Sequence, residues 1–88
     1  HSGYIASVIY EKDLMPVKTK EAGIFRRLKQ EGDDVRFGEV VAEIIDPFEG
    51  YVKMQIISPT DGIIFFAHNE PLVMENTVIF KIIKKMYN

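Results

Sequence analysis

One pattern of glycine turns and short apolar segments occurs twice in the chain, and it limits the folds that the chain can adopt. Gly23 opens the pattern in the first half, and Gly62 opens it in the second. Gly38 follows Gly23 after 15 positions, and Asn76 follows Gly62 after 14. Asn tolerates a positive φ better than most residues, so Asn76 is a suitable replacement for a turn glycine. The repeat predicts two similar units that bury their apolar faces against each other.

Each unit is expected to contain a strand, a turn, a short apolar anchor, a second turn and another strand. The anchors are Val35 and Val73. No helical stripe is sustained anywhere, even in Thr19–Glu31, which Gly23 interrupts. The expected strands are Tyr4–Tyr10, Met15–Lys18, Gly23–Leu28, Val40–Ile45, Tyr51–Ile57, Gly62–Ala67 and Val78–Ile83. The predicted fold class is all-β, a flattened β-barrel or sandwich of two pseudo-symmetric β units.

The composition is that of an ordinary globular domain with one compact core, given 88 residues of which 47% are hydrophobic. A net charge of −2, with acids and bases interleaved, provides no basic field, so nucleic acid is not an expected partner. The apolar runs are much shorter than a membrane span, so no membrane partner is expected either. The absence of cysteine fits a reducing compartment, and a cytoplasmic location is expected.

The first residues suggest that the chain is a piece of a longer protein. It opens with His1-Ser2-Gly3 and has no initiator methionine, so residues 1–3 are interpreted as a tag remnant or a cut end. Residues 4–14 are expected to form a leading strand or linker from an upstream domain. Residues 15–88 are expected to form the β domain itself.

The turn motifs resemble those of biotinyl/lipoyl-type domains. In that fold each half carries a glycine at a strand start, a Gly-Asp-x-Val turn and a second glycine before the next strand. The corresponding residues here are Gly32–Gly38 and, near the join of the two units, Ser58–Gly62. The resemblance implies a barrel-sandwich hybrid, which is the architecture of biotinyl and lipoyl carriers.

Lys53 is the candidate for an attached biotinyl or lipoyl group. In biotin carriers that resemble this sequence, the modified lysine stands at the hairpin tip, farther from the following proline than the six positions that separate Lys53 from Pro59. The turn residues Asp46–Gly50 lie upstream of Lys53, which predicts the tip there and Lys53 on the returning strand. Lys53 is therefore expected to face solvent without a cofactor, with Val52 and Met54 on the opposite face of the strand.

A longer stretch resembles the C-terminal domain of the succinylglutamate desuccinylase/aspartoacylase-like family. The motifs are Glu43–Gly50, Ile57–Gly62 and Asn69–Val73, within a resemblance that covers roughly Met15–Ile83. In that family the linking hairpin typically carries an Asp and a Gly and no carrier lysine. The resemblance implies a non-catalytic accessory domain. Its partner would be an upstream catalytic domain in the same chain, which hydrolyses N-acyl amino acids with zinc held by two histidines and a glutamate.

No catalytic, cofactor-binding or metal-binding residue is assigned to this chain itself. His1 belongs to the expected tag, and His68 is interpreted as a solvated loop residue because its spacing to Glu70 does not match a His-x-x-Glu ligand pair. The piece alone is therefore not expected to be an enzyme or to bind zinc, whereas the parent protein is expected to be a zinc-dependent amidohydrolase.

Other polar motifs have simpler structural interpretations. Asp33, Asp34 and Asp61 stand beside glycine and are interpreted as turn formers rather than calcium ligands. Gly32–Gly38 lacks the strand and helix that flank a phosphate-binding loop. Short basic clusters are interpreted as solvated, edge-guarding charges of a sheet: Lys18 with Lys20, Arg26 and Arg27 with Lys29, and Lys81 with Lys84 and Lys85.

Two other functions remain open from the sequence. One is a prosthetic-group carrier in an acyl- or carboxyl-transfer complex, which depends on Lys53. The other is a barrel-sandwich module of a periplasmic adaptor or another structural protein, since one architecture serves many functions. The neighbouring chain distinguishes them, because an adaptor would carry long coiled-coil helices and a hydrolase would carry a zinc site.

The aromatic residues predict an exposed apolar patch. Alternation along a strand places Phe65 and Phe66 on opposite faces. Ile64 shares the face of Phe66, so Phe66 is expected to be buried and Phe65 to point outward. Phe65 and Phe48, at the hairpin tip, are then expected to form one patch that packs on the catalytic domain or drives self-association.

Overall fold

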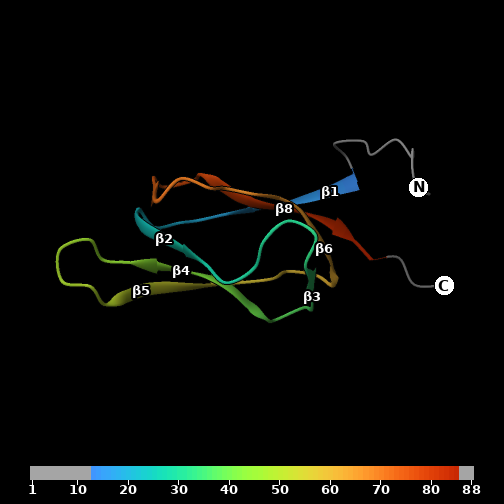
Figure 1. The fold of residues 1–88 in the computed structure, drawn as a ribbon, viewed down its shortest axis with the longest axis horizontal. Coiled ribbons are helices and arrows are strands. Elements are labelled where there is room, and N and C mark those ends of the chain that lie inside the picture. The colour runs from blue at the N-terminus through green and yellow to red at the C-terminus, as the bar shows by residue number, and fades with distance from the viewer. Residues whose placement is uncertain (1–12, 86–88) are drawn as a thin grey trace.

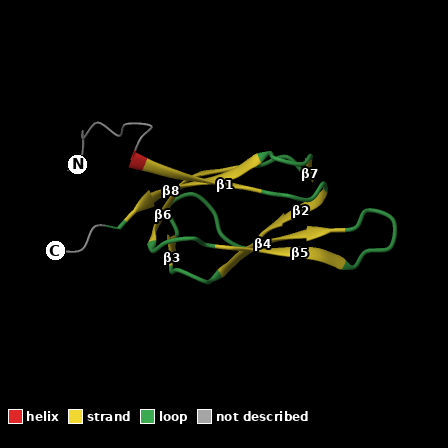
Figure 2. Ribbon diagram, turned by 180° about the vertical axis from the view of Figure 1, so that it is seen from behind, coloured by secondary structure: helices red, strands yellow, loops and turns green. Residues whose placement is uncertain are grey.

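The computed structural model describes residues 13–85, which form eight strands in two four-stranded antiparallel sheets (Figure 1). The strands are β1 (Leu14–Lys18), β2 (Gly23–Arg27), β3 (Asp34–Val35), β4 (Val40–Ile45), β5 (Val52–Ile57), β6 (Gly62–Ala67), β7 (Leu72–Val73) and β8 (Val78–Lys84). Sheet A has the order β1-β8-β6-β3, and sheet B has the order β5-β4-β2-β7. The two layers are visible in Figure 2. The predicted all-β class is therefore confirmed.

The predicted strands agree with the observed ones to within one residue at each end, wherever they fall among residues 13–85. The segment Thr19–Glu31 contains β2 and no helix, as predicted. The two short anchors of the repeat are themselves strands, β3 and β7, of two residues each. The predicted strand Tyr4–Tyr10 lies outside the described residues. Within residues 13–85 there is no helix with the length and apolar character needed to cross a membrane.

The repeat is visible in the way the strands are shared between the sheets. Sheet A has β1 and β3 at its edges and β8 and β6 in its centre, whereas sheet B has β5 and β7 at its edges and β4 and β2 in its centre. Strands β1 to β4 therefore correspond to β5 to β8. Each sheet takes its edge strands from one half of the chain and its central strands from the other half, so neither half completes a sheet alone.

The correspondence extends to irregularities in the strands. Val41 is the extra residue where β4 pairs with β5, and Ile79 is the extra residue where β8 pairs with β1. Such a bulge interrupts alternation and lets two consecutive residues face the same side. Val41 and Ile79, each followed by another buried residue, are both completely buried.

Gly23 and Gly62 occupy equivalent places at the starts of β2 and β6, and both are required by close approach of the neighbouring strand. A Cβ atom on Gly23 would lie 2.7 Å from the carbonyl oxygen of Ile45. A Cβ atom on Gly62 would lie 2.2 Å from the carbonyl oxygen of Ile83. Only glycine fits at either place without a shift of backbone.

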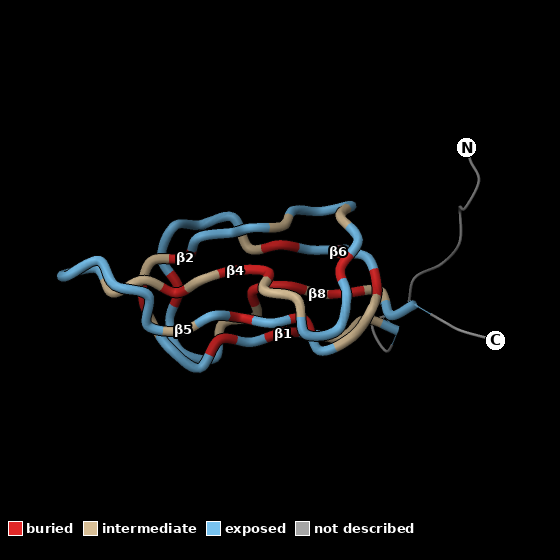
Figure 3. The backbone as a smooth tube through the Cα atoms, turned by 90° about the horizontal axis from the view of Figure 1, so that it is seen from below, coloured by how far each residue is buried: buried red, intermediate tan, exposed pale blue. Residues whose placement is uncertain are grey.

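The core lies between the sheets and receives side chains from both. Buried residues, which are red in Figure 3, occur on strands of both sheets. Its largest completely buried residues are Phe80, Ile44, Ile64, Ile79, Ile82 and Val41. Phe25 packs edge-on against Phe80, with 5.9 Å between the ring centroids. Burial of these apolar side chains is the main favourable contribution to the stability of the fold.

Two polar residues, Thr19 and Ser58, are buried at equivalent places after β1 and β5. The Thr19 hydroxyl donates to the carbonyl of Glu21 at 2.8 Å and accepts from the amide of the same residue at 3.0 Å. The Ser58 hydroxyl makes the same two contacts with Thr60, at 2.6 and 3.4 Å. Both hydroxyls are satisfied locally, which removes the cost of burying them.

The predicted burial of Phe66 is wrong. Phe66 is 39% exposed and Phe65 is 47% exposed. The cause is a bulge in β6: Ile64 pairs with Ile82 and Phe66 pairs with Lys81, which leaves Phe65 as an extra residue. The bulge interrupts alternation after Ile64, so both aromatic side chains lie on the outer side of sheet A.

Candidate functional site

The hairpin between β4 and β5 joins the two halves and extends beyond the rest of the molecule, at the left of Figure 1. Its turn is organised by Asp46. The carboxylate of Asp46 accepts hydrogen bonds from the amides of Phe48 at 3.1 Å and Glu49 at 2.6 Å. The carbonyl oxygen of Asp46 accepts from the amide of Gly50 at 2.9 Å, and Gly50 has a φ of 81°. The predicted tip at Asp46–Gly50 is confirmed.

The tip holds an aromatic side chain in solvent. Phe48 is 92% exposed, and the neighbouring Tyr51 is 54% exposed. Because the turn is fixed by hydrogen bonds, little further ordering would be needed for Phe48 to enter a pocket of a partner. Phe48 lies on the hairpin of sheet B, whereas Phe65 and Phe66 lie on β6 of sheet A. The single patch expected from the sequence is therefore divided into two separate surfaces.

Lys53 lies on the returning strand β5, as predicted, and its ammonium group is engaged by the first half of the chain. It donates to the carbonyl of Ala22 at 2.7 Å, 31 positions away, and lies 3.5 Å from a carboxylate oxygen of Glu21. No motif in the sequence indicates these contacts, because they depend on the turn between β1 and β2 meeting the start of β5.

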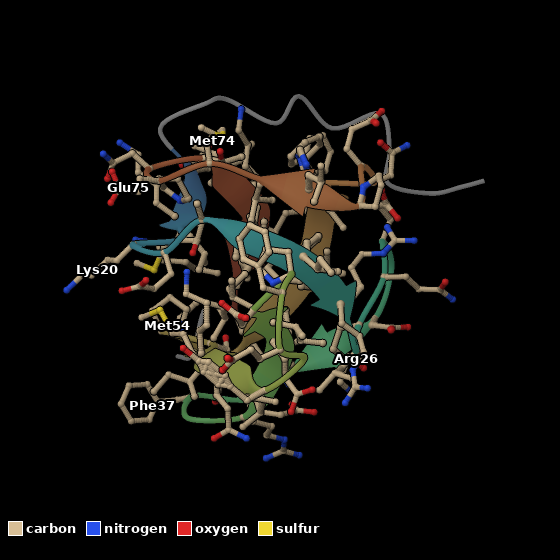
Figure 4. All side chains as sticks on the ribbon, turned by 90° about the vertical axis from the view of Figure 1, so that its left-hand side faces the viewer. Lys20, Arg26, Phe37, Met54, Met74 and Glu75 are labelled. Carbon is tan, nitrogen blue, oxygen red and sulfur yellow. The ribbon has the colours of Figure 1, made fainter. Side chains whose placement is uncertain are left out.

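The expectation that Val52 and Met54 share a face is wrong, because Lys53 is the extra residue of another bulge. Val52 pairs with Ile45 and Met54 pairs with Ile44. Met54, labelled in Figure 4, packs against the core, whereas Val52 is 46% exposed. The bulge also turns Lys53 toward Ala22.

Of the three acidic residues interpreted as turn formers, Asp33 and Asp61 bind backbone amides, whereas Asp34 lies in β3 rather than in a turn. The carboxylate of Asp33 accepts from the amide of Gln30 at 2.9 Å, within its own turn. The carboxylate of Asp61 accepts from the amide of Phe37 at 2.7 Å and so joins two turns. In the part of the chain that the structure describes, no three His, Asp or Glu side chains are grouped so that they could hold a metal ion.

The basic side chains of β2 and its following loop have acidic partners. Arg26 (Figure 4) pairs with Glu43, Arg27 lies 3.5 Å from Glu31, and Lys29 lies 2.9 Å from Glu39. The hydrogen bond from Lys29 lowers the pKa of Glu39, and the amide of Arg36 assists at 3.0 Å. The same hydrogen bond raises the pKa of Lys29. These pairs fit the interpretation of charged surface residues on a sheet.

His68 is half-buried rather than fully solvated, which differs from the expectation. Its ring packs edge-on against Phe25, with 5.6 Å between the centroids. Its Nε2 atom lies 3.3 Å from the carbonyl oxygen of Leu72. These contacts give His68 a packing role at the end of β6, beside β7.

The fold is similar to one part of much larger solved structures. A succinylglutamate desuccinylase/aspartoacylase from Rhodobacter sphaeroides matches with a TM-score of 0.72 and 19% identity over 83% of this chain. A protein described as a succinylglutamate desuccinylase/aspartoacylase from Shewanella frigidimarina NCIMB 400 matches with a TM-score of 0.71 and 18% identity over 86% of this chain. An aspartoacylase family protein from Mesorhizobium loti matches with a TM-score of 0.71 and 18% identity over 83%.

The matched region covers 22%, 21% and 24% of those three chains, so this chain spans less than a quarter of the length of each. No family's sequence model matches this chain, and no curated protein does. The fold, two antiparallel sheets of four strands, is thus one that succinylglutamate desuccinylase/aspartoacylase proteins contain as a part.

Proposed function

We propose that this chain is a non-catalytic barrel-sandwich domain of the biotinyl/lipoyl type, which serves as the C-terminal accessory domain of a zinc-dependent succinylglutamate desuccinylase/aspartoacylase-like hydrolase. The observation that carries the proposal is the backbone similarity over 83–86% of this chain to only 21–24% of the neighbouring structures. A chain that matches a part this small is expected to work beside a larger catalytic unit.

The contacts of Lys53 favour the accessory-domain function over the carrier function. A carrier lysine must project from the hairpin tip so that its cofactor can reach other active sites. Here the ammonium group of Lys53 is bound to Ala22 and Glu21, and the tip presents Phe48 instead. Zinc is assigned to the upstream domain, because the described residues contain no donor set that fits it.

The proposed role of the domain is to shape or partly cover an active site that the upstream domain builds. The β4–β5 hairpin is the element suited to this role, since it is long, internally hydrogen-bonded and ends in an exposed aromatic residue. An apolar side chain that closes an active site excludes water and strengthens the electrostatic interactions inside it.

The test is to clone the coding region upstream of Tyr4 and to assay the longer protein with N-succinylglutamate and N-acetylaspartate. We expect zinc-dependent hydrolysis by the longer protein, and a lower kcat/KM in its Phe48→Ser variant. The Leu72→Ser variant, which changes an exposed residue away from the tip, is the matched control. An upstream region that encodes coiled-coil helices would instead support the adaptor function.

A second measurement distinguishes an accessory domain from a prosthetic-group carrier. The mass of the intact chain is determined after co-expression with biotin and lipoyl ligases. An unmodified mass supports the accessory domain, whereas quantitative addition at Lys53, lost in Lys53→Arg, would replace the proposal with a carrier.

A further inference from the structure

Strand β5 forms one edge of sheet B, and in the part of the chain that the structure describes no strand pairs with its other side. In an antiparallel ladder the amide and carbonyl of one residue point to the same side, and those of the next residue point to the opposite side. Ser58, directly after β5, points inward, since its amide donates to Glu39 at 2.8 Å and its carbonyl accepts from Gly38 at 2.9 Å. Alternation then turns the backbone groups of Gln55 and Ile57 away from β4.

The first residue of β5 also points outward. The carbonyl of Tyr51 accepts from the amide of Asp46 at 2.8 Å, so Tyr51 points inward. Val52, the next residue, therefore directs its amide and carbonyl to the free side, and Lys53 is the extra residue of the bulge. Val52 and the two outward residues named above thus present backbone donors and acceptors that another strand can pair with.

The other edges of the two sheets are protected against such pairing. β3 and β7 are only two residues long. β1 contains Pro16, which pairs with Lys81 of β8 as Gln55 pairs with Glu43 of β4. Lys81 and Glu43 occupy the same place in the repeat, so Pro16 and Gln55 are equivalent. Proline has no N–H group to donate and guards an edge, whereas glutamine leaves the edge of β5 open.

The side chains at the outward positions of β5 are uncharged and exposed. Val52 is 46% exposed, Ile57 is 52% exposed, and Gln55 between them is exposed as well. They form a stripe with a polar centre and a β-branched residue at each end. Lys53, the charged residue of β5, is bound to the turn between β1 and β2, so its ammonium group does not guard the edge.

A second copy of the chain matches this stripe through a two-fold axis. When two β5 strands run antiparallel with Gln55 opposite the partner's Gln55, Ile57 lies opposite the partner's Val52, and the reverse pair forms as well. The bulge makes this match, because it takes Lys53 out of alternation and leaves Val52 and Ile57 equally far from Gln55 along the ladder. The two glutamine amides each carry donors and an acceptor, and no like charges meet on the axis.

We propose that β5 pairs with β5 of a second copy of this chain, antiparallel and centred on Gln55, so that the two B sheets become one continuous sheet. The proposal is independent of the enzymatic role proposed above, because the edge belongs to this chain alone. One added strand buries less than a standard interface of about 1,600 Å², so the dimer is weak and reversible.

The test is sedimentation equilibrium of the complete chain at concentrations up to about 1 mM, where weak dimers form. We expect the average mass to rise from that of a monomer toward that of a dimer. Amide hydrogen exchange in the same samples locates the contact. Exchange at Val52, Gln55 and Ile57 should slow about threefold for each tenfold rise in concentration once the dimer dominates, since the free fraction falls as the square root. Exchange at Met54 and Ile56, whose amides point toward β4, should change much less.

Variants of Gln55 make the result specific. Gln55→Pro removes an outward N–H group, as Pro16 does in β1, so the fold should persist and the dimer should be lost. Gln55→Lys and Gln55→Glu each place like charges on the axis and should be monomeric, whereas an equimolar mixture of the two should dimerise. Leu72→Lys, a change of an exposed residue on the opposite edge of sheet B, is the matched control and should leave association unchanged.

Three results would overturn the proposal. One is a chain that stays monomeric at the highest concentration. Another is association that persists in Gln55→Pro and Gln55→Lys, which would place the contact on a different surface. The third is a mixture of the two charged variants that remains monomeric, which would show that the pairing is not centred on Gln55. Should Gln55→Pro disturb the fold, the charged variants test the same contact.

Discussion

The two sheets have equivalent inner faces and different outer faces. Inside, Ile44 of β4 and Ile82 of β8 occupy corresponding places, and both are completely buried. Outside, the ion pair of Arg26 with Glu43 on sheet B corresponds to Phe66 with Lys81 on sheet A. The repeat is thus retained where side chains must fill the core, and it has diverged where they meet solvent or a partner. Equivalent substitutions on the two inner faces should therefore change the stability by similar amounts. Equivalent substitutions on the two outer faces should have different effects.

The largest effect is expected from truncating the core. Ile44→Ala and Ile82→Ala each remove a completely buried side chain and should lower the free energy of unfolding by about 2–5 kcal/mol. The equivalence of the inner faces predicts that the two losses are similar, since both side chains are completely buried in corresponding strands. Denaturant unfolding of both variants measures this. A large difference would show that one sheet dominates the stability.

The next effect should come from the glycines that start β2 and β6. Gly62→Ala places a Cβ atom 2.2 Å from a backbone oxygen, compared with 2.7 Å for Gly23→Ala. Overpacking against backbone typically costs about 1–3 kcal/mol. At Gly23 the φ of 156°, which residues with a Cβ atom rarely adopt, adds strain to the contact. Thermal unfolding should therefore place both variants clearly below wild type. A variant as stable as wild type would mean that its strand relaxes at that place.

A smaller effect, the coupling energy between paired side chains, should distinguish the two pairs on the outer faces. A double-mutant cycle on Arg26 and Glu43 is expected to give a coupling energy of about 0.2–1 kcal/mol that falls as salt is added, because the pair is partly exposed. The same cycle on Phe66 and Lys81 should give about 0.5–1 kcal/mol. Part of that contact is apolar, so its coupling energy should depend less on salt. Identical salt dependence in both cycles would contradict this distinction.

The smallest effect concerns the turns before β4 and β8. In the first, Glu39 accepts from the amide of Arg36 at 3.0 Å; in the second, the hydroxyl of Thr77 accepts from the amide of Met74 at 3.2 Å. The pKa of Glu39 is lowered in the fold, so its stabilisation is present above its ordinary value of 4.5 and is lost as pH falls through the lowered value.

Glu39→Gln should therefore be slightly less stable than wild type at neutral pH, and the difference should disappear in acid. Thr77→Val, which also removes an acceptor for a turn amide, is the matched control and should give a difference that does not change over the same range. Unfolding measured from pH 7 to pH 3 provides the comparison. A constant difference for Glu39→Gln would show that its charge contributes nothing.

The longer strands could be predicted from the sequence because runs of β-branched and aromatic residues end at glycine, proline and aspartate. The bulges could not. Alternation from Ile64 predicts a buried Phe66, and alternation across Lys53 predicts that Val52 and Met54 share a face; an extra residue reverses both results. A bulge depends on pairing with a distant strand, and no local motif marks it in these two places.

The candidate site was predicted in part. The tip at Asp46–Gly50 follows from local turn chemistry, and so does the position of Lys53 beyond it. The contacts of Lys53 with Ala22 and Glu21 could not be predicted, because they join the turn after β1 to the strand after the tip. The equivalence of Thr19 with Ser58 was also missed, since the residues around them differ in sequence.

The sharing of strands between the halves has a consequence for biosynthesis. During translation β1 and β3 emerge with the first half of the chain, yet their partners β8 and β6 belong to the second half, so sheet A cannot be completed until β8, the last strand, has left the ribosome. The exposed hairpin tip is the natural place to cut such a chain. We expect peptides 1–48 and 49–88 to be unfolded separately and to reconstitute the fold when mixed, as circular dichroism would detect. A single half, duplicated as two separate molecules, would by the same pairing assemble only as a dimer.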